Sequence, residues 1–287
     1  MFRPVAQLPL DYSVFKDKKS IFSWAPSGAI LFGNGAAAKT GEELKKLGVK
    51  KATLVTDQGL VKFGIAAKII ESVKNAGIEL NVYDQCEPDS SVETVEKIAD
   101  LSKEADVIIG LGGGSSMDPA KAAAIVVTNG GSIRDYQGCD KFKTAPLPIV
   151  AIPTAAGTGS ECTPFAVIAD RQREWKMPIG GTGIMPALAI CDPELTYSLP
   201  AGITAATGMD ALTHAIEAYT SRCTEPISDA LACQAVKLIA HALRPAVYRG
   251  DSDKDARYDM MMGAMLAGYA FTTASLGISH CMAHPLG

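Results

Sequence analysis

The sequence lacks both a basic surface and an apolar segment long enough to cross a membrane. Its 27 Lys and Arg are outnumbered by 31 Asp and Glu, the formal net charge is −4, and no basic run concentrates positive charge. A nucleic-acid-binding face needs such a concentration. No stretch reaches the roughly 18 apolar residues that span a bilayer, and residues 1–20 contain no continuous apolar core of a signal peptide. These absences argue against nucleic acid or a membrane as partner and predict a cytoplasmic protein.

Cysteine is scarce and scattered. The seven cysteines are an odd number and form no C-x-x-C pair, so neither a zinc knuckle nor a disulfide scaffold is predicted, and we interpret them as reduced thiols. Apolar residues make up 47% of the chain and charged residues 20%. That balance supports a large buried core rather than disorder, and it favours a globular protein that acts on small molecules.

The first two thirds of the chain alternate between strand-like and helix-like segments. Short apolar or β-branched runs lie at residues 51–56, 80–83, 106–110, 147–153 and 188–191, and helical patterns at 65–75, 92–103 and 119–127. Such alternation is typical of a parallel sheet covered on both faces. From residue 204 on, nearly every segment has a helical period and is rich in Ala, Leu and Met. We therefore predict a Rossmann-like α/β domain over residues 1–199 and an all-helical domain over residues 200–287.

A glycine-rich loop joins the strand that begins at residue 106 to the helix that follows. It contains Gly112, Gly113, Gly114 and Ser115. Glycines let the backbone approach a phosphate closely, and the helix start offers free N–H groups. The pattern departs from G-x-G-x-x-G, so a tight turn that binds nothing is the alternative interpretation.

Two further segments suit a nucleotide. Asp57 closes the strand at 51–56, where a carboxylate can accept hydrogen bonds from the ribose of NAD and repel the extra phosphate of NADP. Asp57 precedes the glycine loop, opposite to the common Rossmann order, and taken alone it is best interpreted as a turn residue. The loop at 153–161 is rich in small and hydroxyl residues, as expected beside a flat ring, although any polar loop could share this composition.

Two pairs of possible metal ligands occur at helical spacing. Asp210 and His214 are four residues apart, as are His280 and His284, so each pair leaves one face of a helix. Each pair alone could be a surface hydrogen bond or a packed interface. Together, polar groups in Ala-rich apolar helices need strong partners, and a divalent cation is one such partner. His241, the remaining histidine, is interpreted as a surface or helix-end residue.

These motifs resemble those of the iron-dependent (group III) alcohol dehydrogenases, a family that includes lactaldehyde reductase and propanediol dehydrogenase. The resemblance runs from about residue 24 to residue 287. It is carried by GGGSSMDPAKA at 112–122, PTAAGTGSE at 153–161, GMDALTHAIEAY at 208–219 and HCMAHPLG at 280–287.

The resemblance implies an NAD-dependent oxidoreductase of small alcohols and aldehydes, with Fe(II) as the metal and zinc as the alternative. It implies Asp210, His214 and His280 as metal ligands, and His284 as a histidine that relays the alcohol proton. The implied cofactor contacts are Asp57, Gly113, Gly114, Ser115, Thr154, Thr158, Thr163 and Lys176. A homodimer or larger homo-oligomer is implied as well.

Two departures accompany the resemblance. Ala155 stands where relatives usually carry a second threonine, and the family's last histidine ligand falls beyond Gly287. We therefore expect a C-terminally truncated helical domain with one carboxylate and two imidazoles at the metal. The alternatives are a maleylacetate-type reductase of the same fold and a catalytically inactive nucleotide-binding fragment. A purely structural oligomerising module is disfavoured because it leaves the Asp and His pairs unexplained.

Overall fold

The chain folds into two compact units, which are described separately. The computed structural model describes Trp24 and residues 28–286, with side chains up to Ala283. One unit comprises Ser27–Ala155 and Ser160–Thr196, and the other comprises Ala156–Gly159 together with the chain from Tyr197 on. The second unit therefore includes four residues of the loop at 153–161.

A six-stranded parallel sheet forms the centre of the first unit. Its order is β1-β9-β6-β4-β2-β3, and every paired strand is parallel. The strands are β1 (Ala29–Phe32), β2 (Lys51–Val55), β3 (Glu79–Tyr83), β4 (Val107–Gly112), β6 (Ile149–Pro153) and β9 (Leu188–Cys191). The two central strands, β4 and β6, are buried along their whole length. This confirms the predicted parallel sheet, because only a sheet covered on both faces buries every residue of a strand.

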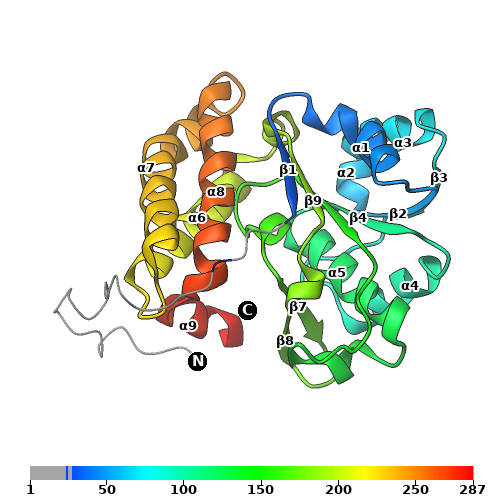
Figure 1. Cartoon of the computed structure of the whole chain (residues 1–287). Helices are drawn as coiled ribbons and strands as arrows, with labels where there is room; N and C mark the ends of the chain where they lie inside the picture. The colour runs from blue at the N-terminus through cyan, green and yellow to red at the C-terminus, as the bar shows by residue number, and fades with distance from the viewer. Residues whose placement is uncertain (1–23, 25–27, 287) are drawn as a thin grey trace. The chain divides into compact units, whose positions relative to one another are not determined.

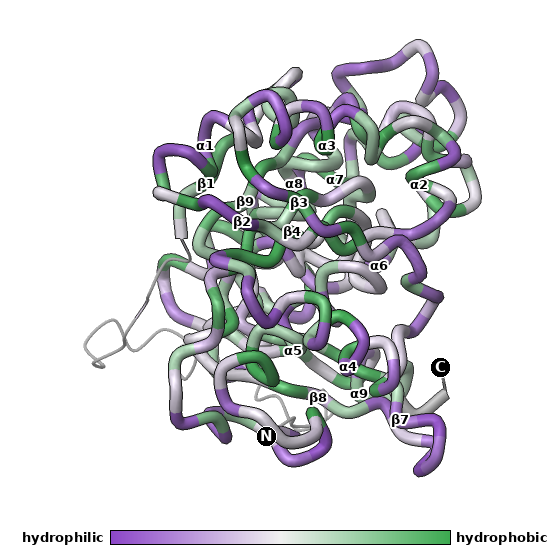
Figure 2. The backbone as a smooth tube through the Cα atoms, turned by 90° about the vertical axis from the view of Figure 1, so that its right-hand side faces the viewer, coloured by the Kyte–Doolittle hydropathy of each residue, from purple (hydrophilic) through white to green (hydrophobic). Residues whose placement is uncertain are grey.

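Helices cover both faces of this sheet. They are α1 (Thr40–Lys46), α2 (Gln58–Lys62), α3 (Ile65–Asn75), α4 (Val92–Leu101) and α5 (Gly114–Asn129). Neighbouring residues of β4 belong to different cores: Ile108 packs in the cluster that contains α4 and α5, and Ile109 packs in the cluster that contains α1 and α3. Successive side chains of a strand point to opposite faces, so one strand supplies both cores. In Figure 2 the peripheral turns are mostly hydrophilic, as this layering requires.

A small second sheet was not predicted from the sequence. It has the order β5-β8-β7, with β5 (Gly138–Cys139), β7 (Phe165–Asp170) and β8 (Trp175–Gly180). β7 and β8 form an antiparallel hairpin in which Ala169 pairs with Lys176 and Asp170 with Trp175. Its turn places Glu174 at φ 48°, an uncommon conformation for a residue other than glycine.

The second unit is helical. It contains α6 (Ala201–Thr220), α7 (Pro226–Arg249), α8 (Lys254–Ala274) and α9 (Ile278–Leu286), and the first three are long helices lying side by side (Figure 1). Small residues allow their close approach: a Cβ at Gly208 would lie 2.3 Å from the Leu243 Cδ1, and one at Gly263 would lie 2.6 Å from the Ile239 Cγ1. Across residues 28–286, no helix combines the length and the hydropathy that crossing a membrane would require.

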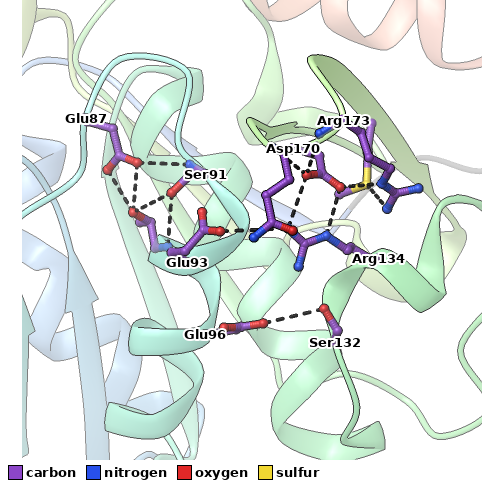
Figure 3. A network of polar contacts seen from close by, with 11 residues as sticks. Glu87, Ser91, Glu93, Glu96, Ser132, Arg134, Asp170 and Arg173 are labelled. Atoms are coloured by element: carbon purple, nitrogen blue, oxygen red, sulfur yellow. Dashed lines mark hydrogen bonds and ion pairs between the residues drawn. The ribbon is translucent and has the colours of Figure 1, made fainter.

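The hairpin is anchored by a carboxylate shared between two arginines. Asp170, whose side chain is fully buried, accepts hydrogen bonds from Arg134 at 2.8 and 3.1 Å and also pairs with Arg173. Figure 3 shows this cluster beside the glutamates of α4. The Arg134 guanidinium holds the pKa of Asp170 well below its usual range, overcoming the effect of burial, and Arg173 adds to it.

We expect Asp170→Asn to lower the free energy of unfolding by about 1–3 kcal/mol, because hydrogen bonds to a charged group are lost. Since the pKa of Asp170 is lower in the folded state, its contribution is present above the ordinary aspartate pKa of about 3.9 and is lost as the pH falls below that value. Urea denaturation at pH 7 and at pH 3 measures both effects. Asp100→Asn, at an exposed ion pair with Lys103, is the control and should change stability little. Equal small losses in both variants would contradict the anchoring role.

Candidate metal centre and nucleotide-binding loops

Helix α6 carries three acidic or imidazole side chains on one face. Asp210, His214 and Glu217 are separated by four and three residues, which places them along one side of the helix over two turns. Gly208 lies two residues before Asp210 and lets α6 pack tightly against α7 and α8. His214 and Glu217 are buried, with exposed fractions of 6%, whereas Asp210 is only partly buried. The face therefore points into the helical unit.

The third predicted ligand reaches this face from α9. Helix α8 ends at Ala274, the next residue Ser275 turns the chain sharply with a φ of 66°, and α9 begins at Ile278. The turn between α8 and α9 stacks the His280 ring on the His214 ring, with centroids 4.3 Å apart and planes inclined by 16°. Phe271 of α8 covers His214 from another side at 4.6 Å. Residues 66 positions apart thus meet only because of this helical turn.

Asp210, His214 and His280 form a compact set of donor atoms. All three offer one ligand atom within 4.8 Å of the others. The Asp210 Oδ1 lies 3.8 Å from the His214 Nε2 and 3.4 Å from the His280 Nε2. One ion with bonds of about 2.1 Å reaches donors up to about 4.2 Å apart, which covers both distances. Two imidazoles and a carboxylate suit a first-row divalent metal, so these residues fit the group that the sequence implies.

The protonation of the two imidazoles differs. Burial lowers the pKa of His214 to about 4, against the attraction of Asp210, and the neighbouring His280 lowers it further. Burial also opposes the charged form of His280, but Asp210 and Glu217 outweigh it and raise the pKa of His280. His214 is therefore neutral at pH 7 and has a lone pair available for a metal.

Glu217 is a member of this cluster to which the sequence interpretation gave no role. Its carboxylate accepts hydrogen bonds from the His280 Nδ1 at 2.6 Å, from the Gly277 N–H at 2.9 Å and from the Ser279 N–H at 2.7 Å. Its position three residues after His214 was a signal available in the sequence, since it places Glu217 on the ligand-bearing face. The partner segment, residues 277–280, was not predictable from that spacing.

His284 lies within α9, but its side chain is outside the described part of the structure. Its predicted part in proton relay accordingly stays a prediction.

The glycine loop lies at the carboxyl end of β4. Gly112 has φ 145°, a conformation that favours glycine, and a Cβ there would lie 2.6 Å from the Ser116 Oγ. Gly113 is the N-cap of α5, and Gly114 and Ser115 are its first residues. A helix start at the carboxyl end of a central parallel strand is a common anion site. Helix α5 begins five residues earlier than the pattern at 119–127 predicted, so Pro119 lies inside the helix. Proline has no N–H to give to the Ser115 carbonyl four residues before it, and this carbonyl accepts from the Ser90 hydroxyl at 2.6 Å.

The sheet brings Asp57 and Thr154 to the same edge. β2 and β6 flank β4, with Val55 opposite Gly110 and Gly112 opposite Pro153. Asp57 and Thr154 therefore follow strands that end beside Gly112, and the Thr154 N–H donates to the Gly112 carbonyl at 3.1 Å. Asp57 also caps α2 by accepting from the Leu60 N–H at 3.0 Å. Asp57 is thus a turn residue, as its sequence context suggested. It also lies where a protein carboxylate that binds the ribose of a nucleotide would be expected.

The remaining predicted cofactor residues come from other segments of the chain. Thr163 is buried beside the start of β7, and Lys176 lies in β8, where its Nζ is 2.9 Å from the Asp89 carboxylate. Thr158 is exposed and belongs to the helical unit. Asp57, Gly113, Gly114, Ser115 and Thr154 therefore follow or begin elements that meet at one edge of the sheet.

A buried lysine supports this region and was also missed. Lys121 is fully buried in α5, and its Nζ donates to the Thr163 and Phe165 carbonyls, each at 2.9 Å. Burial lowers the pKa of Lys121 to about 8, although the nearby Asp118 opposes this. Asp118 in turn accepts from the Ser160 hydroxyl at 2.7 Å and the Val167 N–H at 2.9 Å. Helix α5 thus holds both ends of the segment that leads into β7.

The chain matches two family models in succession. Residues 27–193 match the model described as iron-containing alcohol dehydrogenase, and residues 204–287 match the C-terminal model of the Fe-containing alcohol dehydrogenase family. The described fold and the two models divide the chain near the same place, at residues 194–203.

Curated proteins and solved structures agree with these matches. The chain is 46% identical over 265 residues to a choline dehydrogenase of Bacillus subtilis, covering 90% of this chain and 65% of that protein. It is 43% identical to an NAD-dependent methanol dehydrogenase of Bacillus methanolicus, covering 90% and 68%. A sulfoacetaldehyde reductase of Bifidobacterium kashiwanohense in complex with NAD+ superposes with a TM-score of 0.88 at 36% identity, covering 93% and 71%. The chain thus spans about two thirds of the length of the curated relatives it matches.

We expect Lys121→Met to lower the free energy of unfolding by about 2–4 kcal/mol, because two buried carbonyls lose their donor and Asp118 loses its cation. Urea denaturation at pH 7 measures the loss. Lys97→Met, at an exposed position of α4, is the control and should lie within about 0.5 kcal/mol of the unmodified chain. A Lys121→Met variant as stable as this control would show that the amine does not hold the segment in place.

Proposed function

Because this chain belongs to the family of iron-containing alcohol dehydrogenases, we propose that it is an NAD(H)-dependent and metal-dependent oxidoreductase that interconverts small primary alcohols and aldehydes. The observation that carries the proposal is the compact donor set of partly buried Asp210 and buried His214 and His280. Polar groups of this kind, buried or partly buried in a helical unit, are costly unless charged or hydrogen-bonding groups offset the loss of water, and a divalent cation bound by all three would do so.

We propose Fe(II) as the metal, with zinc as the alternative, held by the Asp210 carboxylate and the Nε2 atoms of His214 and His280. When bound, the metal supplies a Lewis acid for the alcohol or aldehyde oxygen, and the nicotinamide accepts or returns the hydride. The chain's own contribution is a preformed geometry: Phe271 and the stacked rings exclude water from one side of His214. His284 is proposed, by resemblance, to relay the alcohol proton.

The nucleotide is proposed to lie along the carboxyl edge of β2, β4 and β6. The start of α5 at Gly113, Gly114 and Ser115 would receive the pyrophosphate, and Asp57 would accept hydrogen bonds from the ribose hydroxyls. Thr154, Thr158, Thr163 and Lys176 are proposed as further contacts. Two relatives support the choice of NAD: one is named NAD-dependent, and another was solved with NAD+. A homo-oligomeric state belongs to the same proposal and is tested by light scattering.

The activity is tested by anaerobic NADH oxidation by this chain with Fe(II), against propanal and lactaldehyde. We expect turnover that a chelator removes. Asp210→Ala should lower turnover by roughly 1,000-fold or more, since a Lewis acid contributes several kcal/mol. The same variant should still bind NADH, because Asp210 lies outside the glycine loop. Metal retained by Asp210→Ala would refute the ligand assignment. Turnover of maleylacetate but of neither aldehyde would favour the sister reductase.

The nucleotide site is tested by Gly113→Val. Gly113 has φ −88°, and no other described residue has an atom within 4 Å of where its Cβ would lie, so stability should change by less than about 1 kcal/mol. If the pyrophosphate lies at this helix start, the added side chain should raise the NADH Kd at least roughly tenfold, or about 1.4 kcal/mol. Fluorescence titration measures it.

Gly202→Val is the matched control, because a Cβ at Gly202 of α6 is also unobstructed. It should leave NADH affinity unchanged. Equal affinity in both valine variants would place the nucleotide elsewhere.

A further inference from the structure

Glu217 is a buried carboxylate for which the proposed reaction has no use. Its exposed fraction is 6%. Removing an ionised carboxylate from water is costly unless hydrogen-bond donors replace the solvent. Among the described residues, Glu217 has three donors, two backbone N–H groups and one imidazole, and they come from residues 277–280. The Glu217 carboxylate of α6 therefore accepts its hydrogen bonds from one short segment at the start of α9.

The backbone of this segment is shaped around the carboxylate. A Cβ at Gly277 would lie 2.8 Å from the Glu217 Oε1 and 3.0 Å from its Cδ, closer than real Cβ contacts allow. Only glycine at 277 therefore permits the approach. Oε1 accepts from the Ser279 N–H, and Oε2 accepts from the Gly277 N–H and faces the His280 ring. Both oxygens of the Glu217 carboxylate thus hold the start of α9 by hydrogen bonds.

The His280 ring is held between two carboxylates of the same helix. Its Nδ1 is 2.6 Å from the Glu217 Oε2, and its Nε2 is 3.4 Å from the Asp210 Oδ1. Glu217 and Asp210 are seven residues apart on α6, a rise of about 10.5 Å. A carboxylate that accepts from Nδ1 fixes the tautomer in which Nε2 carries the free lone pair. That nitrogen is the one that faces Asp210 and His214.

We propose that Glu217 is a positioning residue of the metal centre, which orients His280 and makes its Nε2 the ligand atom. This inference rests on the proposed function, because it takes Asp210, His214 and His280 as the ligands. Residues that orient ligands in this way typically change metal affinity by about 10–100-fold when they are removed.

The chain offers a matched control in the same helical unit. Glu225 is also buried, with an exposed fraction of 8%, and its carboxylate accepts from the Ile227 and Ser228 N–H groups, each at 2.7 Å, at the start of α7. Like Glu217, it accepts from backbone N–H groups at the start of a helix, but no histidine contact is described for it. Any effect of Glu217 that Glu225 lacks therefore reports on the imidazole rather than on loss of a buried carboxylate.

The first experiment measures the affinity of the full chain for Co(II) and for Zn(II) by competition with a chromophoric chelator. We expect Glu217→Gln and Glu217→Ala to weaken binding of each metal by about 10–100-fold, and Glu225→Gln to leave it within about twofold while lowering Tm. Asp210→Ala separates the two proposals. If the unmodified chain binds no better than Asp210→Ala, the ligand assignment itself fails. If Asp210→Ala loses the metal and Glu217→Gln retains it, only the positioning role fails.

A second readout addresses the ring directly. In the Co(II)-loaded chain, paramagnetically shifted proton resonances report the ring N–H groups of histidine ligands. The His280 Nδ1–H should exchange slowly with solvent while Glu217 accepts it, and at least tenfold faster in Glu217→Ala. The His214 ring and the Glu225→Gln variant provide reference rates. Unchanged exchange in Glu217→Ala would overturn the proposal even if the metal affinity had fallen.

Gly277→Ala tests the same contact without removing the carboxylate. The added Cβ should displace Glu217 from the segment and weaken Co(II) binding in the same direction as Glu217→Gln. This variant keeps the proposal testable if Glu217→Ala fails to fold. Co(II) affinity equal to that of the unmodified chain, in a folded Gly277→Ala, would count against the positioning role.

Discussion

The helical unit depends on how it solves one electrostatic problem: acidic and imidazole groups are buried among Ala, Met and Phe side chains. A carboxylate without donors in such surroundings costs several kcal/mol. Glu217 avoids this cost by accepting from two backbone N–H groups and from His280, and that requirement fixes where α9 must begin. Gly277 is needed for the same reason, since any side chain there would meet the carboxylate. The place of His280 beside the other two candidate ligands thus follows from the need to satisfy a fourth group.

The first unit also buries charged side chains, and it supplies their hydrogen-bond partners with different residues. Lys121 is buried completely and donates to two carbonyls at the start of β7, and Asp170 is buried between Arg134 and Arg173. These contacts hold the small β-sheet and the segment that contains Thr163. The sheet edge proposed to bind the nucleotide needs fewer special contacts, because the carboxyl ends of β2, β4 and β6 meet wherever parallel strands are aligned.

Elements with strong periodicity were predictable and those with weak periodicity were not. Residues 65–75 and 188–191 were predicted with the observed bounds of α3 and β9, since a helical stripe and a continuous apolar run are strong local signals. The β7–β8 hairpin was missed because Phe165 and Trp175 are exposed while Asp170 is buried, which reverses the expected alternation. The start of α5 was placed too late because glycine has a low helix propensity, so the glycines at the start of this helix were assigned to a loop. Glu217 was seen within its motif, but nothing local indicated its partners.

The sequence by itself determined the ligand candidates, the glycine loop and the alternation of strands and helices that builds the large sheet, because spacing on one helix and apolar runs along one strand are local properties. Asp210 and His214 are joined by a single helical turn, so their proximity needed no tertiary information. Only the tertiary structure decided that His280 stacks on His214 and that Glu217 holds its other nitrogen. Those contacts join residues more than sixty positions apart, and they depend on the turn at Ser275, on the close helix packing at Gly208 and on the space left by Gly277. Such long-range contacts arise from packing, which a local pattern in the sequence does not encode.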